Sequence, residues 1–235
     1  MTPERYARIC RTLKRRRPDL TVAMEDVHKA HNLAAICRTA DAVGIGWIHG
    51  VTADPSIRLT HRSASGTNKW VSARSHASTD AAVAHLREAG MAIVVATPGE
   101  AAVDYREADY TGPTALLVGA ELAGISERAV ALADRLVTIP MAGMGESLNV
   151  SVACALILFE AMRQREARGL YDTRRLDDAT HARLLFEWCW PQVAAVYRRR
   201  GRPYPRLNEM GDPLQPLCDD RLARPPARGG PRSAA

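Results

Sequence analysis

Short apolar runs recur along the first 140 residues and alternate with stretches of helical periodicity. The runs lie at residues 21–24, 45–51, 92–97, 114–119 and 136–139. Because each run is continuously apolar, each predicts a strand that is covered on both faces. Helical spacing of apolar residues marks the intervening segments 32–44, 80–89 and 126–134. This alternation predicts an α/β fold, a parallel sheet flanked by helices.

Helical patterns also occupy both ends of the chain. Residues 4–17 predict a short basic helix, and residues 178–200 an amphipathic one. A longer helix over about 147–168 is apolar almost all round, so it needs cover on more than one side and favours contact with a second subunit. From residue 208 onward Pro, Gly and Arg dominate, and we expect a disordered or loosely docked tail there.

The positive charge is concentrated near the two ends. The chain has a formal net charge of +6, whereas residues 1–17 alone carry +6 and residues 198–206 carry +5, which leaves −5 on the remainder. Two basic blocks on a mildly acidic body are typical of a protein that binds a polyanion; a solvated helix face is the alternative. The candidate contacts to a polyanion in these blocks are Arg8, Arg11, Arg16, Arg17, Arg199 and Arg202.

Composition excludes several classes of protein. With 235 residues, 46% hydrophobic and 25% charged, the chain is not mostly disordered. Its five cysteines show no C-x-x-C pairing, which argues against a disulfide framework and a structural zinc site. No apolar segment follows the basic start, and the longest one, 148–159, is too short to span a bilayer. We expect a soluble cytoplasmic protein without a metal or a membrane partner.

Two glycine-rich segments, 117–126 and 139–151, each follow a predicted strand and precede a predicted helix. Open α/β sheets bind ligands at such places. The backbone of these loops offers N–H and C=O groups to a small, flat ligand. No G-x-G-x-x-G follows the first strand, which disfavours a dinucleotide site and hence a nicotinamide-dependent oxidoreductase.

Together with residues 32–44, these segments resemble the three motifs of the SpoU branch of the SPOUT RNA methyltransferases. The first motif is the helix that carries Asn32 and Arg38, the second spans 119–126 and the third 139–153. The resemblance extends to about residue 207, and within the branch the chain is most similar to the TrmH family.

The resemblance implies S-adenosylmethionine-dependent 2′-O-methylation of guanosine 18 in the D-loop of tRNA. It also implies a homodimer, and a deep trefoil knot at about residues 114–165 (the SPOUT fold) that binds the cofactor. The cofactor contacts implied by correspondence are Thr97, Gly119, Ile139 and Leu148. The residues implied around the reaction centre are Arg38, Asn32, Glu121, Ser147 and Asn149.

The same resemblance divides the chain into four parts. A basic N-terminal helix occupies residues 1–18, and the methyltransferase domain residues 19–170. A C-terminal helical extension follows at 171–207, and a flexible tail at 208–235.

The implied site residues also have ordinary structural interpretations. Asn32 suits a helix N-cap, and Arg38, off the apolar stripe of its helix, suits a solvated position. Asn149, one turn into a buried helix, is harder to explain in this way because a buried amide needs partners. Glu146 stands where the family usually has a neutral residue, and we expect a modest effect on binding.

The role of Arg38 has two versions. The family assigns to this arginine the removal of the proton from the ribose 2′-hydroxyl. Because a guanidinium ordinarily keeps its own proton, Arg38 could instead clamp the neighbouring phosphate while that phosphate or a water accepts the proton. Beyond this, the same chemistry on ribosomal RNA or at another tRNA position is an alternative, and a non-catalytic RNA-binding protein is a remote one.

Overall fold

The computed structural model describes residues 1–52, 69–120 and 123–217. The chain divides into two compact units. The larger unit consists of residues 15–175, and the smaller unit of residues 1–14 with the chain from residue 176 onward. In the described parts of both, no helix is long and apolar enough to cross a membrane.

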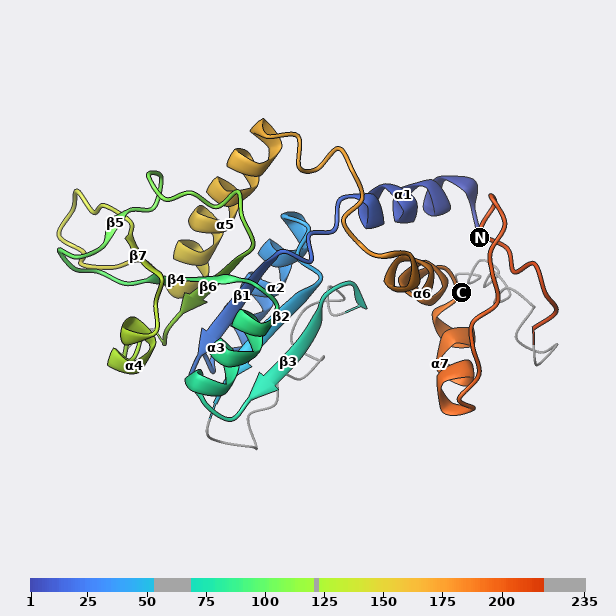
Figure 1. Ribbon diagram of the computed structural model, residues 1–235, viewed down its shortest axis with the longest axis horizontal. Coiled ribbons are helices and arrows are strands. Elements are labelled where there is room, and N and C mark those ends of the chain that lie inside the picture. The colour runs from blue at the N-terminus through green and yellow to red at the C-terminus, as the bar shows by residue number, and fades with distance from the viewer. Residues whose placement is uncertain (53–68, 121–122, 218–235) are drawn as a thin grey trace, which may run out of the picture. The chain divides into compact units, whose positions relative to one another are not determined.

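The larger unit is built on a seven-stranded sheet in the order β3-β2-β1-β6-β4-β7-β5 (Figure 1). All neighbouring strands are parallel, which confirms the predicted fold class. The strands are β1 (Leu20–Glu25), β2 (Trp47–Val51), β3 (Ser72–His76), β4 (Ala92–Ala96), β5 (Val103–Asp104), β6 (Thr114–Val118) and β7 (Arg135–Thr138). The central pair β1 and β6 is buried along its whole length, as their continuous apolar runs require.

Helices cover both faces of this sheet. On one face, α2 (Ala30–Ala42) and α5 (Val150–Ala167) share a core with alternate residues of β6, such as Leu116. On the other face, α3 (Thr79–Glu88) and α4 (Glu127–Ala131) contribute to a second core with the intervening residues, such as Leu117. Because successive side chains of a strand point to opposite faces, one apolar run supplies both cores.

The smaller unit is helical. It contains α1 (Pro3–Lys14), α6 (Asp178–Cys189) and α7 (Pro191–Arg199), with α1 in contact with α6. The single helix predicted over 178–200 is therefore divided. Pro191 has no N–H and restricts the residue before it, so Trp190 adopts a non-helical backbone with φ −131° and ψ 58°.

Of the tail predicted to be disordered or loosely docked from residue 208 onward, residues 208–217 form hydrogen bonds within the smaller unit, and residues 218–235 lie outside the described part of the chain. The Asn208 Oδ1 atom accepts hydrogen bonds from the N–H groups of Met210 and Asp212, both at 2.9 Å. The Tyr6 hydroxyl donates to the Asn208 carbonyl at 3.2 Å, and Trp190 Nε1 donates to the Gly211 carbonyl at 2.8 Å. Tertiary hydrogen bonds thus order a segment whose composition alone predicts disorder.

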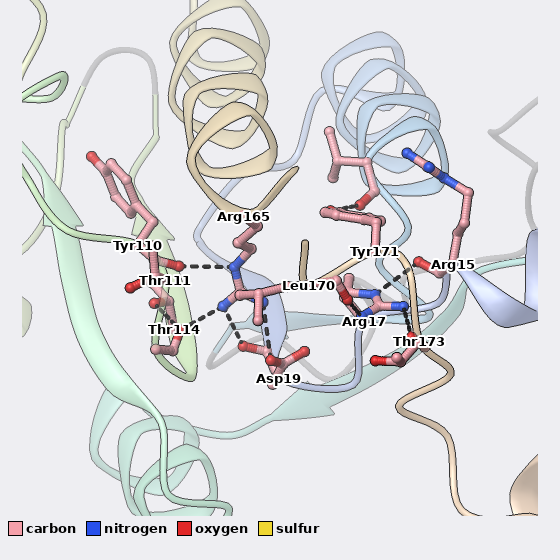
Figure 2. A network of polar contacts seen from close by, with 12 residues as sticks. Arg15, Arg17, Asp19, Tyr110, Thr111, Thr114, Arg165, Leu170, Tyr171 and Thr173 are labelled. Atoms are coloured by element: carbon pink, nitrogen blue, oxygen red, sulfur yellow. Dashed lines mark hydrogen bonds and ion pairs between the residues drawn. The ribbon is translucent and has the colours of Figure 1, made fainter. Parts of the chain in front are cut away.

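Two arginines of the N-terminal basic block are buried in the larger unit. Arg16 is 1% exposed and donates to the Ile45 carbonyl at 2.7 Å and to the Asp41 carboxylate at 2.6 Å. Arg17 is fully buried and donates to backbone carbonyls, including that of Thr173 at 3.0 Å (Figure 2). The interpretation of Arg16 and Arg17 as RNA contacts is therefore wrong, because their guanidinium groups are used inside the fold.

Arg165 of α5 is a third buried arginine, and Figure 2 shows it between two loops. Its Nε atom donates to the Tyr110 carbonyl at 2.8 Å, and its Nη2 atom donates to the Asp19 carbonyl at 2.9 Å and to the Gly112 carbonyl. Its Nη1 atom lies 3.1 Å from the Asp19 carboxylate. One side chain therefore joins the C-terminal part of α5 to the loops before β1 and β6.

Replacing Arg165 by leucine is expected to lower the free energy of unfolding by about 3–5 kcal/mol, because it leaves the partly buried Asp19 carboxylate and three backbone carbonyls without the donors of a buried guanidinium. The measurement is urea unfolding followed by circular dichroism. Arg163→Leu is the matched control on the same helix, since Arg163 is largely exposed and pairs with Glu160 one turn away. Equal stability losses in the two variants would contradict the structural role of Arg165.

Candidate active site

A pocket of about 330 Å³ lies at the carboxyl ends of β4, β6 and β7. Three loops and one helix line it: residues 96–98 after β4, 118–120 and 123–125 after β6, 137–139, 141 and 146–148 after β7, and the first turns of α5. This is the edge at which parallel α/β sheets bind ligands, and the volume is in the range of small-molecule sites, roughly 300–1,000 Å³. The two glycine-rich segments identified in the sequence meet here.

Two glycines give the loop after β6 its shape. A Cβ atom on Gly119 would lie 2.1 Å from the Gly124 carbonyl oxygen, so no larger residue fits at position 119 without a backbone shift. The Gly124 N–H donates to the Ala120 carbonyl at 2.9 Å, and Gly124 has φ +69°, which L side chains rarely adopt. The described residues of this loop, 119–120 and 123–125, form one wall of the pocket.

The four residues predicted to contact a cofactor all line this pocket: Thr97, Gly119, Ile139 and Leu148. Ser147, predicted near the reaction centre, lines it as well. Glu146 alone carries an ionisable side chain among the described lining residues, and the other side chains are small, hydroxylic or apolar. The pocket can therefore recognise a ligand through backbone polar groups and apolar contact.

Asn32 and Asn149 lie next to each other at the starts of two helices. The Asn149 Nδ2 atom donates to the Asn32 Oδ1 atom at 3.2 Å. The prediction of Asn32 as a helix N-cap is wrong, because Lys29 is the N-cap of α2 and Asn32 lies inside the first turn, 1% exposed. Asn149 is itself the N-cap of α5, with Oδ1 accepting from the Ser151 N–H at 2.9 Å, so it does not lie one turn into the helix. The amide of Asn149 thus binds both its own helix and Asn32.

The remaining predicted site residues are not brought into the pocket. Arg38 is exposed on α2, is not among the pocket-lining residues, and forms no ion pair with any residue that the structure describes. Because Asn32 and Arg38 are six residues apart on one helix, they point to different sides of it. Glu121 lies outside the described residues.

A cluster formed by His49 of β2, His76 of β3 and His85 of α3 was not predicted from the sequence. His49 Nδ1 lies 2.9 Å from His76 Nε2, the ring of His85 is 5.6 Å from that of His49, and Arg74 lies 2.6 Å from the His85 Nε2 atom. Burial, with smaller contributions from the neighbouring His76, His85 and Arg74, lowers the pKa of His49 to about 4. The described residues include no group of His, Cys, Asp and Glu that could hold a metal ion.

The low pKa of His49 predicts that the free energy of unfolding falls as the pH drops from 6.5 to 4. In this range the unfolded chain, with an ordinary histidine pKa of 6.5, binds a proton that folded His49 does not. We expect a loss of about 2–3 kcal/mol across this range that is absent in His49→Gln. Urea unfolding of both proteins at a series of pH values measures it, and parallel pH profiles would contradict the assignment to His49.

Comparison with known protein families gives matches over most of the chain. Residues 19–159 match the SpoU rRNA Methylase family, and residues 163–215 match the family described as "SpoU, rRNA methylase, C-terminal". These two ranges contain the pocket, α2 and the C-terminal helices.

Individual relatives extend this similarity. The chain is 51% identical over 214 residues to the tRNA (guanosine(18)-2′-O)-methyltransferase of Escherichia coli strain K12, covering 90% of this chain and 93% of the relative. It is 49% identical over 187 residues to the enzyme of the same name from Thermus thermophilus, covering 80% and 96%. A 23S rRNA (guanosine-2′-O-)-methyltransferase of Pseudomonas syringae is 38% identical over 156 residues, covering only 64% and 61%.

Solved structures agree with this grouping. The crystal structure of the Aquifex aeolicus TrmH/SpoU tRNA modifying enzyme superposes with a TM-score of 0.72 at 37% identity, covering 79% of this chain and 94% of that one. The SpoU methyltransferase AviRb of Streptomyces viridochromogenes in complex with the cofactor AdoMet superposes with a TM-score of 0.55 at 33% identity, covering 66% and 62%.

Proposed function

The chain belongs to the SpoU rRNA Methylase family, and from this premise we propose that it methylates the ribose 2′-hydroxyl of guanosine 18 in tRNA, with S-adenosylmethionine as methyl donor. The observation that carries the choice of substrate is the extent of the similarity. The tRNA enzymes match both units of the chain, whereas the ribosomal RNA enzyme matches less than two thirds of it. A tRNA substrate also assigns the protein to the cytoplasm.

The pocket at β4, β6 and β7 fits S-adenosylmethionine. Its volume suits a small molecule, and Thr97, Gly119, Ile139 and Leu148 present backbone groups and apolar surface to it. When bound, S-adenosylmethionine supplies a methyl group activated by a sulfonium. We assign those four residues to cofactor binding, and Glu146 to a modest effect on affinity through its charge.

Arg38 acts on the RNA in this proposal. It is exposed and lies apart from the cofactor pocket, so it is available to a phosphate. An exposed guanidinium keeps its proton, and its fork of N–H groups matches a phosphate. We therefore assign to Arg38 the clamping of the phosphate next to the target ribose, which orients the 2′-hydroxyl while the phosphate or a water accepts its proton. The family's literal general-base role for Arg38 is the alternative.

Asn32, Asn149, Ser147 and Glu121 are assigned to holding the reaction centre in place. The hydrogen bond between Asn149 and Asn32 holds the starts of α5 and α2 together. Because α5 begins at the pocket and α2 carries Arg38, this bond couples cofactor binding to the position of the arginine. Ser147 lines the pocket directly, and Glu121 belongs to the site by correspondence with the family's second motif.

On the basis of the family resemblance, we further propose a trefoil knot at about residues 114–165 and a homodimer. One feature of α5 supports the dimer: Val152, Leu156 and Phe159 are 47%, 39% and 50% exposed within the chain. Apolar side chains exposed along one helix are typical of a surface that a second subunit covers. Ile157, by contrast, lies in the chain's own core at 1% exposed, so it does not belong to this surface.

We assign tRNA binding to the basic residues of the smaller unit. Arg8 and Arg11 are exposed on α1, and Arg199 and Arg202 are exposed at and after the end of α7. Their charges are available to phosphates, unlike those of the buried arginines at the start of the larger unit.

Replacing Arg8 and Arg11 together by glutamine is expected to weaken tRNA binding and to make it less dependent on salt. Each phosphate contact contributes roughly 0.7–0.9 to the slope of log affinity against log salt, so the slope should fall by about 1–2 units. The measurement is tRNA binding at a series of salt concentrations. The double lysine variant keeps both charges and should keep the slope. A glutamine variant with the wild-type slope would show that α1 presents only a solvated face.

The proposed activity is tested with tRNA transcripts and labelled S-adenosylmethionine. We expect label in a transcript with guanosine at position 18 and none in one with 2′-deoxyguanosine there, because the deoxyribose lacks the acceptor hydroxyl. Equal labelling of both transcripts would contradict the proposed site of methylation. No labelling at all, with tRNA still bound, would favour the non-catalytic alternative.

A further inference from the structure

Glu25, the last residue of β1, is a buried carboxylate that the proposed reaction does not use. It is 6% exposed and lies at the carboxyl edge of the sheet, where β1 runs beside β6. A carboxylate in such a position is costly unless donors satisfy it. Its contacts therefore indicate what it holds in place.

Donors from two other segments converge on Glu25. The Ser126 N–H donates to Oε2 at 2.8 Å, and the Ser126 hydroxyl donates to Oε1 at 2.9 Å. The Thr79 hydroxyl also donates to Oε1. Thr79 is the first residue of α3, and Ser126 is the N-cap of α4, where its Oγ atom accepts from the Ala129 N–H at 3.1 Å. The carboxylate thus fastens the starts of two helices to the end of β1.

Ser126 directly follows a wall of the pocket. Residues 123–125 line the pocket. On their N-terminal side, the Gly124 N–H donates a hydrogen bond to the Ala120 carbonyl, close to the end of β6. Two residues after Gly124, Ser126 makes two hydrogen bonds to Glu25. The position of the wall therefore depends on an acceptor on a neighbouring strand.

We propose that Glu25 is a positioning residue for the cofactor pocket: by accepting both donors of Ser126, it holds the preceding residues 123–125 in place as a wall of the pocket. This inference rests on the proposed function only for the identity of the ligand, S-adenosylmethionine. Glu25 does not line the pocket, so it acts through Ser126 and not by contact.

The test measures S-adenosylmethionine affinity by calorimetry and, in the ligand-free protein, hydrogen exchange of the Ser126 amide by NMR. In Glu25→Ala, three donors lose their acceptor, and we expect about tenfold weaker binding with about tenfold faster exchange at Ser126. Glu25→Gln keeps an acceptor for the Ser126 N–H, and the hydroxyls can turn to accept from its amide. We expect this variant to stay within about threefold of wild type in both measurements.

Thr79→Val is the matched control. It removes a hydroxyl that donates to the same carboxylate, but this hydroxyl belongs to α3 and does not line the pocket. We expect its affinity to stay within about twofold of wild type. If Glu25→Ala does not fold, Ser126→Ala carries the test with an expected loss of about threefold in affinity.

Wild-type affinity and Ser126 exchange in folded Glu25→Ala, or wild-type affinity in Ser126→Ala, would overturn the role of Glu25 and leave the proposed function intact. A wild-type protein that binds no S-adenosylmethionine would overturn both.

Discussion

Replacing Arg38 by alanine is expected to lower the rate of tRNA methylation by about 10³-fold and to leave S-adenosylmethionine affinity within twofold. Removing one preorganised donor from a reaction centre costs about 10²–10³ in rate, and loss of a clamped orientation adds to this. The fold should be unaffected, since Arg38 is exposed and belongs to neither core. Single-turnover kinetics and calorimetry measure the two effects separately.

Arg38→Lys distinguishes the two roles of the arginine. If Arg38 clamps a phosphate, lysine keeps the charge but loses the bidentate fork, so part of the activity should return. If Arg38 removes the proton, the lysine amine can take its place and loses its own proton at lower pH than a guanidinium, so the rate of Arg38→Lys should level off at lower pH than that of the wild type, whereas a phosphate clamp leaves the pH profile unchanged. Wild-type turnover in folded Arg38→Ala would contradict both roles.

Replacing Leu156 by aspartate is expected to give a monomer with methylation reduced at least about 100-fold. Leu156 lies on the exposed apolar side of α5, and a charge there would have to be buried without a partner when two subunits meet, at a cost of several kcal/mol. The start of the same helix lines the cofactor pocket, which links the interface to the site. Light scattering at micromolar concentration and activity assays measure the two results.

Two further substitutions on α5 make the dimer test specific. Leu156→Met keeps the surface apolar and should remain dimeric and active. Ile157→Asp places the charge in the chain's own core and should unfold the protein instead of separating two folded subunits. A monomeric wild type with full activity would refute the proposed dimer.

Most strands of the sheet could be predicted because a strand buried on both faces has a continuous run of apolar residues. A strand without such a run was not predicted. β3 has the sequence Ser-Ala-Arg-Ser-His and lies at the edge of the sheet, so it needs no continuous apolar run. The ligand loops were predictable for a related reason, since their close backbone approaches require glycine, as at Gly119.

The errors concern side chains whose role depends on distant parts of the chain. Asn32 has the residue type of an N-cap, yet its amide accepts from Asn149, 117 residues away. Arg16 and Arg17 add to the charge of the N-terminal block, but carbonyls of residues far along the chain bind them inside the fold. The local sequence shows the charge and the helix or strand propensity of a segment. These contacts join distant segments and form only when the sheet is assembled.

The most direct test of the proposed activity is mass-spectrometric mapping of ribose methylation in tRNA from a strain that lacks this protein. We expect 2′-O-methylguanosine to be absent at position 18, to return when the wild-type chain is supplied, and to stay absent with Arg38→Ala. Methylation that persists at position 18 in the deletion strain, or a loss found at another tRNA position or in ribosomal RNA, would contradict the account.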